Sequence, residues 1–256
     1  MNLCYNSNNI TYSIERKVTI IYHNIFNASN HNTSNIGESI YYILRKGIIE
    51  LELKPGEPLV VKDIANKLEV SRSPVRDSII KLGKEGLVDI IAQKGTYVSK
   101  IDLDRVEEER FIRSSLEEKA VLLFMEQYTS SSIIRLESLI EMQKASLDRQ
   151  DYTSFLDYDD EFHSIFFYVA NKRMSWDLIH SMSGHYRRFR LITLWDLEIA
   201  EDIIKQHQMM LQYIKEKDIE MINKSVQEHV MRILSQKTYM VEKYPSYFQQ
   251  KMKVIF

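Results

Sequence analysis

Cysteine, glycine and proline are scarce in this sequence of 256 residues, which has one cysteine, seven glycines and four prolines. A single cysteine, Cys4, cannot form a disulfide within the chain, so nothing calls for an oxidising compartment and we expect a cytoplasmic protein. Scarce glycine and proline favour long helices over a sheet-rich fold with many tight turns. No apolar run approaches the roughly 20 residues of a membrane span, and no signal peptide is evident.

The bulk composition is that of a soluble globular protein, with 44% apolar and 27% charged residues. The length favours two domains of modest size over one compact domain. A net charge of -2 argues against a protein that coats nucleic acid indiscriminately. An average can hide a local basic patch, so the charge has to be considered segment by segment.

The first hundred residues divide into a variable extension and a segment with three predicted helices and a hairpin. Residues 1–36 are rich in Asn and Ser around a short apolar patch at 18–22, and we interpret them as an extension of unknown function. Helical spacing of apolar residues then predicts helices from Gly37 to the Lys54-Pro55-Gly56 turn, over 61–68 and over 72–84. Two β-rich runs, 86–91 and 96–99, predict a hairpin with Gly95 at its turn.

The predicted fold is therefore mainly α. Residues 37–101 form a winged helix-turn-helix of three helices and a β-hairpin, and residues 102–243 form an antiparallel bundle of six or seven helices. The bundle helices are expected over residues 103–127, 131–147, 152–170, 174–194, 199–215 and 219–242. Residues 244–256 are left as a C-terminal tail.

The third predicted helix has the features of a DNA-recognition helix. A helix that enters the major groove needs long donors or small groups toward the bases and an apolar face toward the preceding helix. Arg72, Ser73 and Arg76 meet the first requirement, and Val75 with Ile79 meets the second. The alternative is that both arginines are ordinary solvated helix charges, as most surface arginines are.

The motifs around this helix resemble those of the GntR superfamily of transcription regulators. The matching segments are 53–56 (LKPG), 63–68 (DIANKL), 70–77 (VSRSPVRD), 82–88 (LGKEGLV) and Lys94-Gly95. The resemblance implies that Arg72 and Arg76 contact bases or phosphates, that Lys62 assists, and that the Lys94-Gly95 tip reaches the minor groove. Where the family usually continues Arg-Glu-Ala-Leu, this chain has Arg76-Asp77-Ser78-Ile79.

The charge of this module suggests how it binds. Residues 37–100 contain eleven Lys or Arg against nine Asp or Glu, a small excess for a DNA-binding domain. Tight binding then needs two copies on an operator with two half-sites, so we expect a homodimer on a palindromic operator.

A second constellation lies in the helical domain. Asp159 and His163 are four residues apart on one helix face, which is a spacing suited to metal ligands. His207 and His229 lie on the fifth and sixth predicted helices, where an antiparallel arrangement can bring them level. Each histidine alone is more often a surface or hydrogen-bonded core residue than a ligand.

Residues of this domain resemble the FCD ligand-binding domain of the FadR subfamily. They are Arg113, Glu117, the run 159–163, Asn171, Gln206, His207, Asp218, Glu228 and His229. The resemblance implies a divalent ion such as Zn, Ni or Mn on Asp159, His163, His207 and His229, with a small carboxylate on the open positions. Arg113 is the candidate partner of that carboxylate, or an ion-pair partner of Glu117, and His185 is a less secure effector contact.

These observations predict a ligand-responsive, DNA-binding transcription regulator and not an enzyme. In the expected mechanism, ligand at the metal centre shifts the bundle, and the linker near 100–104 passes the shift to the winged helices of a dimer. Two alternatives stay open: a metal-dependent enzyme that uses the His/Asp centre, and a regulator whose metal is only structural.

Overall fold

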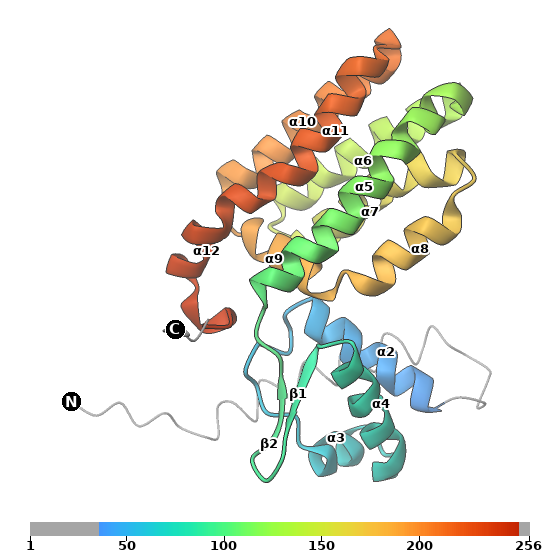
Figure 1. Cartoon of the computed structure of the whole chain (residues 1–256). Coiled ribbons are helices and arrows are strands. Elements are labelled where there is room, and N and C mark those ends of the chain that lie inside the picture. Colours follow the sequence, from blue (N-terminus) through green and yellow to red (C-terminus); the bar gives the residue numbers. More distant parts are fainter. Residues whose placement is uncertain (1–35, 251–256) are drawn as a thin grey trace, which may run out of the picture. The chain divides into compact units, whose positions relative to one another are not determined.

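The computed structural model describes residues 36–250, and the apolar patch predicted at 18–22 lies outside them. The chain divides into two compact units, one ending at Lys100 and the other beginning at Ile101. Figure 1 shows the elements of both units.

The first unit contains three helices and a two-stranded hairpin. Its elements are α2 (Ile36–Ile49), α3 (Val61–Lys67), α4 (Arg72–Lys84), β1 (Val88–Ile91) and β2 (Gly95–Val98). The strands pair antiparallel with Val88 opposite Val98 and Ile91 opposite Gly95. Gly95 has a φ of +128° at the tip, a backbone conformation that side chains with a Cβ rarely adopt. The predicted three helices and hairpin are confirmed.

Helix α4 is anchored by one apolar face. Val75, Ile79 and Leu82 are buried in a single core with residues of α2 and α3. Ser78, which stands where the family usually has alanine, is also buried, and its hydroxyl lies within hydrogen-bonding distance of the carbonyl oxygens of Pro74, at 2.8 Å, and of Gly37, at 3.0 Å. The hydroxyl at this position therefore has acceptors in α4 itself and in α2, and it is not left unsatisfied.

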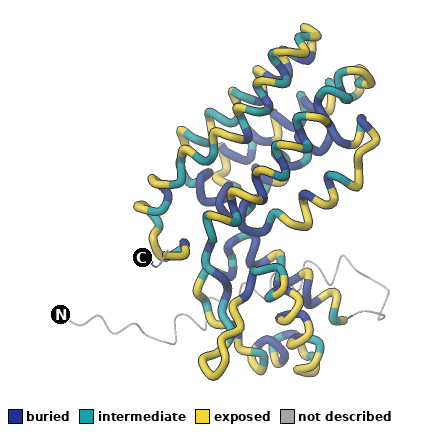
Figure 2. The backbone as a smooth tube through the Cα atoms, in the orientation of Figure 1, coloured by how far each residue is buried: buried dark blue, intermediate teal, exposed yellow. Residues whose placement is uncertain are grey.

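The second unit is a helical bundle. Its helices are α5 (Leu103–Gln127), α6 (Ser130–Asp148), α7 (Tyr152–Val169), α8 (Arg173–Met182), α9 (Gly184–Thr193), α10 (Leu197–Glu216), α11 (Ile219–Arg232) and α12 (Lys237–Lys243). Five of them form a closed ring, because α5 packs on α7, α7 on α6, α6 on α10, α10 on α11 and α11 on α5. Within this bundle the helix faces turned inward are buried and the outer faces exposed (Figure 2).

One predicted helix, 174–194, is two helices in the structure. Helix α8 ends at Met182 and α9 begins at Gly184, with Ser183 between them. The Ser183 hydroxyl donates back to the carbonyl of Ile179, and glycine follows at the next position. Serine back-bonding and the low helix propensity of glycine both favour a break here.

The C-terminal prediction also needs correction. The predicted helix 219–242 is α11, a 3₁₀ turn at Ile233–Gln236 and α12, although no glycine or proline marks the change. Residues 244–249, predicted as part of a tail, are packed into the second unit. Phe248 is 1% exposed, and Ile101 exchanges backbone hydrogen bonds with Tyr247 and Gln249. A second 3₁₀ turn, Pro245–Tyr247, leads into this contact.

Candidate metal centre and its cavity

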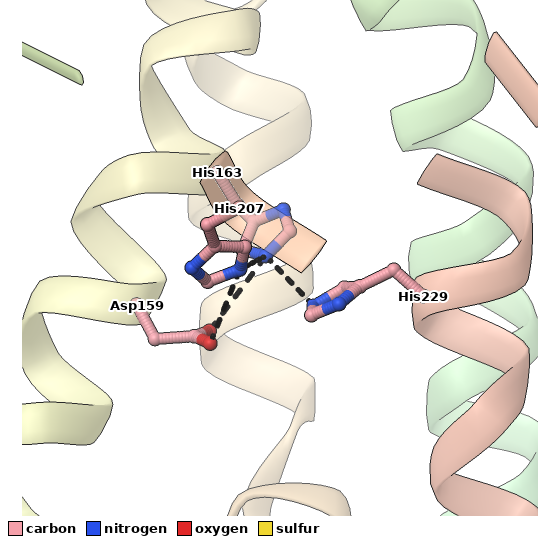
Figure 3. A group of neighbouring side chains, drawn as sticks. All are labelled: Asp159, His163, His207 and His229. Carbon is pink, nitrogen blue, oxygen red and sulfur yellow. Dashed lines mark hydrogen bonds and ion pairs between the residues drawn. The ribbon is translucent and has the colours of Figure 1, made fainter. Parts of the chain in front are cut away.

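Four side chains from three helices of the ring converge at one point (Figure 3). Asp159 and His163 come from α7, His207 from α10 and His229 from α11. The Nε2 atom of His163 lies 3.2 Å from Nε2 of His229 and 3.3 Å from Nε2 of His207. The Asp159 carboxylate oxygens lie 3.7 Å from Nε2 of His207 and 3.8 Å from Nε2 of His163.

The far nitrogen of each imidazole has its own oxygen acceptor. Nδ1 of His207 donates to the amide oxygen of Gln143 at 2.9 Å, and Nδ1 of His229 donates to that of Gln206 at 2.7 Å. Nδ1 of His163 contacts the carboxylate of Glu117. Because these oxygens only accept, the proton of each neutral ring sits on Nδ1 and the Nε2 lone pairs face one another.

The local electrostatics keep His207 and His229 neutral. Burial lowers the pKa of His207 to about 3, although Asp159 raises it, and burial with the neighbouring histidines lowers the pKa of His229 well below its usual value. Burial alone would raise the pKa of Asp159, but Arg190 and the neighbouring histidines hold it below its usual value. The centre thus presents one carboxylate and two neutral imidazoles, and Nε2 of His163 faces both of these imidazoles.

This donor set fits a divalent metal ion. Lone pairs that face each other with no proton between them repel unless a cation lies among them. Ligands held at about 2.0–2.1 Å from one ion lie roughly 3 Å apart, close to the 3.2 and 3.3 Å measured between the imidazoles. Hydrogen bonds from the outer nitrogens to oxygen acceptors are the usual support of metal-bound histidine. The cluster is therefore able to hold a metal ion.

A cavity of about 750 Å³ opens beside this centre. Asp159 and His229 line it from the centre, and Arg113, Tyr186 and Arg190 line its buried end. Its exposed mouth includes side chains from the first turns of α10. A volume of this size accepts a small organic molecule.

The buried end of the cavity holds a network of charges. Arg113 donates to Glu117 at 3.0 Å and lies 3.6 Å from Asp160 and 3.9 Å from Asp159. Arg190 donates to Asp160 at 2.6 Å and also pairs with Asp159. Burial would raise the pKa of Glu117, but His163 and Arg113 bring it to about 2. Arg113 therefore forms the expected ion pair with Glu117 and also lines the cavity.

His185 does not contribute to this cavity. Its ring is buried, and Nδ1 accepts a hydrogen bond from the backbone N–H of Asp102 at 3.0 Å. Among the described residues that line the cavity, helix α9 supplies Tyr186 and Arg190. The effector contact expected at His185 thus has no geometric support, and this side chain instead holds the start of the second unit.

The predicted DNA-binding residues share one property in the first unit. They are all exposed: Lys62, Arg72, Ser73, Arg76, Lys94 and Gly95. Arg72, Ser73 and Arg76 occupy the first turns of α4, on the side away from its buried apolar face. Lys94 and Gly95 lie at the tip of the hairpin.

Comparison with known families agrees with both constellations. The family model described as "Bacterial regulatory proteins, gntR family" matches residues 36–98, and the FCD domain model matches residues 110–232. The chain belongs to the GntR family. Its helical domain is an FCD domain, so this is a DNA-binding transcription regulator of the GntR/FCD type.

Two relatives from Escherichia coli K12 illustrate the similarity of this GntR-family chain to known regulators. It is 29% identical over 201 residues to the HTH-type transcriptional repressor RspR, covering 78% of this chain and 88% of RspR. It is 24% identical to the regulator McbR over 171 residues, covering 66% of this chain and 77% of McbR. The solved structure of E. coli McbR/YncC shares the fold, with a TM-score of 0.65, 20% identity, and coverage of 83% and 100%.

These relatives are transcription regulators and not enzymes, as the sequence predicted for this GntR-family chain. Among residues 36–250, no helix has the length and apolar character needed to cross a membrane. Two features of the site were not predicted from the sequence, because no sequence motif marks them. One is the hydrogen bond from His207 to Gln143, and the other is the group of exposed acidic residues at the cavity mouth. Arg190 belongs to a basic run, 187–190, which ordinarily indicates a solvated surface but was also a candidate for the cavity lining. Arg190 is the member of this run that lines the cavity.

Proposed function

We propose that this regulator senses a small carboxylate through a divalent metal ion on Asp159, His163, His207 and His229. The observation that carries the proposal is the meeting of three imidazole lone pairs beside a cavity with two buried arginines. When bound, a divalent ion there supplies positive charge and open coordination positions for an anionic oxygen. Zn, Ni and Mn all suit this mixed nitrogen and oxygen donor set.

Arg113 and Arg190 are the proposed side chains that bind the ligand carboxylate together with the metal ion. Their guanidinium groups reach both the cavity and the carboxylates of Asp159 and Asp160. A guanidinium can hold a ligand carboxylate through two parallel hydrogen bonds. An incoming carboxylate therefore competes with the two aspartates for the arginines, and this competition changes how α9 is held against α7.

Contacts of α9 support a route from the cavity to the linker. Its C-terminal half carries Arg190, which pairs with Asp159, and its N-terminal half carries His185, which holds Asp102. Phe189 of the same helix contacts the ring of Phe248 at 6.1 Å between centroids. In the proposed mechanism, a ligand-dependent shift of α9 alters the linker that leads to the winged helix.

For DNA, the proposed contacts are Arg72 and Arg76 with bases or phosphates, supported by Ser73, Lys62, Lys94 and Gly95. Their exposure at the free edge of α4 and at the hairpin tip supports these roles. The small positive excess of the first unit supports binding as a homodimer on a palindromic operator.

The surface of α8 supports such a dimer. Met174, Leu178 and Met182 recur at intervals of four residues on one face of the helix, and they are 83%, 49% and 41% exposed. A contiguous exposed apolar stripe of this kind is typical of a protein–protein interface. A second copy of this chain is the proposed occupant.

A titration of operator DNA tests the function. The metal content of the purified protein is measured first, and an operator is selected from random DNA. Operator affinity is then measured by fluorescence anisotropy with and without small carboxylates, and before and after treatment with chelator. A carboxylate that alters operator affinity in the metal-loaded protein, and loses this effect after chelation, supports the proposal.

Two other results would each overturn it. Turnover of a carboxylate by the metal-loaded protein would make the centre catalytic. Metal with no response to any carboxylate would make it structural.

A further inference from the structure

The cavity beside the metal centre differs in charge between its buried and exposed ends. Around the buried end, the buried carboxylates of Glu117, Asp159 and Asp160 face the guanidinium groups of Arg113, Arg187 and Arg190. Arg187 also pairs with the exposed carboxylate of Asp157, so these pairs carry one net negative charge before any metal ion is counted. A divalent ion reverses that sign and leaves the buried end positive, and this end suits a carboxylate.

The exposed mouth has the opposite character. Of its acidic side chains, Asp202 pairs with Arg232 at 3.0 Å and Asp196 pairs with Lys243 at 3.3 Å. Glu198 and Glu201 form no ion pair with any described residue, and Lys205 is the cation left to balance them. The mouth thus retains an excess of negative charge.

The spacing along α10 sets the distance between the two ends. Glu201 precedes His207 by six residues on this helix, which corresponds to about 9 Å at 1.5 Å per residue. The Glu201 side chain and the contact between metal and ligand carboxylate each cover part of this distance, so an extended acid of roughly five or six carbons spans the remainder.

We infer that the ligand of this cavity is a carboxylic acid whose far end carries an ammonium group and not a second carboxylate. The inference rests on the proposed carboxylate sensing and adds the chemistry of the distal group. The carboxylate meets Arg113, Arg190 and the metal, and the ammonium meets Glu198 and Glu201. A second carboxylate at the mouth would face two like charges and lose affinity.

Matched acids that differ only at the far end test this assignment. The probes are 5-aminopentanoate, 5-hydroxypentanoate and glutarate, with 6-aminohexanoate, 6-hydroxyhexanoate and adipate as the longer series. Binding to the metal-loaded full chain is measured by calorimetry. In at least one series we expect the amino acid to bind about tenfold more tightly than the dicarboxylate, with the hydroxy acid between them.

Substitutions on α10 test whether the preference for the amino acid over the dicarboxylate comes from the acidic side chains at the cavity mouth. In a chain with Glu198→Gln and Glu201→Gln, we expect the preference for the amino acid to fall to about twofold or less. Glu216→Gln is the matched control, because Glu216 is an exposed acid on the same helix away from the cavity lining. We expect this control to keep the full preference.

The outcomes separate the inference from the function on which it rests. Tighter binding of the dicarboxylates would overturn the distal ammonium and leave carboxylate sensing intact. A preference for the amino acid that survives the double substitution would overturn the role of Glu198 and Glu201. Failure of every probe to bind the metal-loaded chain would overturn carboxylate sensing itself, and the inference with it.

Discussion

Each imidazole of the candidate metal centre is oriented by a separate acceptor from another helix. Gln143 on α6 orients His207 on α10, Gln206 orients His229, and Glu117 on α5 contacts His163. A ligand whose outer nitrogen is fixed in this way loses little rotational freedom when a metal binds. These supporting residues should therefore control metal affinity without contacting the metal.

Substitution of Gln143 by methionine tests this point. Gln143→Met removes the acceptor of the His207 Nδ1 proton while keeping an unbranched side chain of similar size. We expect metal affinity to fall about 10- to 100-fold, as measured by competition with a chelator of known affinity. Gln208→Met, at an exposed position on α10, is the control and should bind metal like the original chain. Equal affinities of the two variants would contradict the role of Gln143.

Glu109 makes the stability of the second unit depend on pH. Its carboxylate accepts from the backbone N–H of Tyr186 at 2.8 Å, and burial, partly offset by this bond and Arg105, raises its pKa to about 7. The folded-state pKa lies above the ordinary value of about 4.5. Its stabilising contribution is therefore complete below about pH 4.5 and is lost as the pH rises toward 7.

Glu109→Gln provides the measurement, because glutamine resembles the protonated acid. Relative to this variant, we expect the unfolding free energy of the original chain to decrease between pH 4.5 and pH 7. The upper limit of this decrease is about 3 kcal/mol. Thermal unfolding of both proteins across that range supplies the comparison. A constant difference between them at all pH values would show that Glu109 does not titrate there.

The sequence indicated which residues could ligate a metal, but not which residues support them. Asp159 and His163 have a recognisable spacing on one helix, and the later histidines follow at positions typical of the FCD domain. Gln143 and Glu109 lie on helices remote in sequence from their partners, by 64 and 77 residues. Contacts of that kind depend on how helices pack, which no local spacing encodes.

At the scale of the element, α4 shows how a helix can be predicted from two independent requirements. Its apolar face and its basic edge both follow from the residue order, and its observed limits, Arg72–Lys84, are those predicted. Helix α9 had no such signal, because nearly all of its residues are buried and an apolar stripe cannot be distinguished. The break before α9 depends on Ser183 and on the cap from Glu109, neither of which forms a motif.

Substitutions on α4 test the proposed DNA contacts. We expect Arg72→Ala or Arg76→Ala to weaken specific operator binding by about 1–3 kcal/mol, because each removes a guanidinium from the exposed edge. Lys84→Ala, at the exposed far end of the same helix, serves as the control. Gel-shift titration measures all three. Operator affinity unchanged by both arginine substitutions would remove α4 as the reading helix.

Helix α9 should couple the cavity to the linker. We expect His185→Ala to leave metal and carboxylate binding within about twofold, while it reduces the effect of carboxylate on operator affinity by about threefold or more. The reason is that His185 holds Asp102, whereas the cavity is lined by other residues of α9. His180→Ala on α8 is the matched histidine control. A variant with unaltered regulation would show that the coupling does not pass through His185.

At the scale of the whole molecule, the proposed assembly determines DNA affinity. Each first unit has little excess positive charge, so the free energy of operator binding must come from two copies. The apolar face of α8 is the proposed contact between them. The sequence predicted the need for a dimer from charge, while the exposed stripe became visible only once the buried face of α8 was known.

A charged substitution on the exposed apolar stripe of α8 tests the proposed homodimer. We expect Leu178→Glu to shift the protein toward the monomer in light scattering, because a carboxylate at an apolar interface loses its hydration. Operator affinity should fall at least tenfold at the same protein concentration. Met209→Glu, on the exposed side of α10, is the control. A dimer that survives Leu178→Glu would place the interface elsewhere.

The closed ring of helices has one more consequence. The metal ligands lie on α7, α10 and α11, and His163 and His229 are separated by 66 residues. An unfolded chain cannot hold these side chains together, so an ion at this centre would bind the folded bundle and would draw the folding equilibrium toward it. Under the proposed function, the supply of metal in the cell then sets how much regulator persists in folded form, before any effector is present.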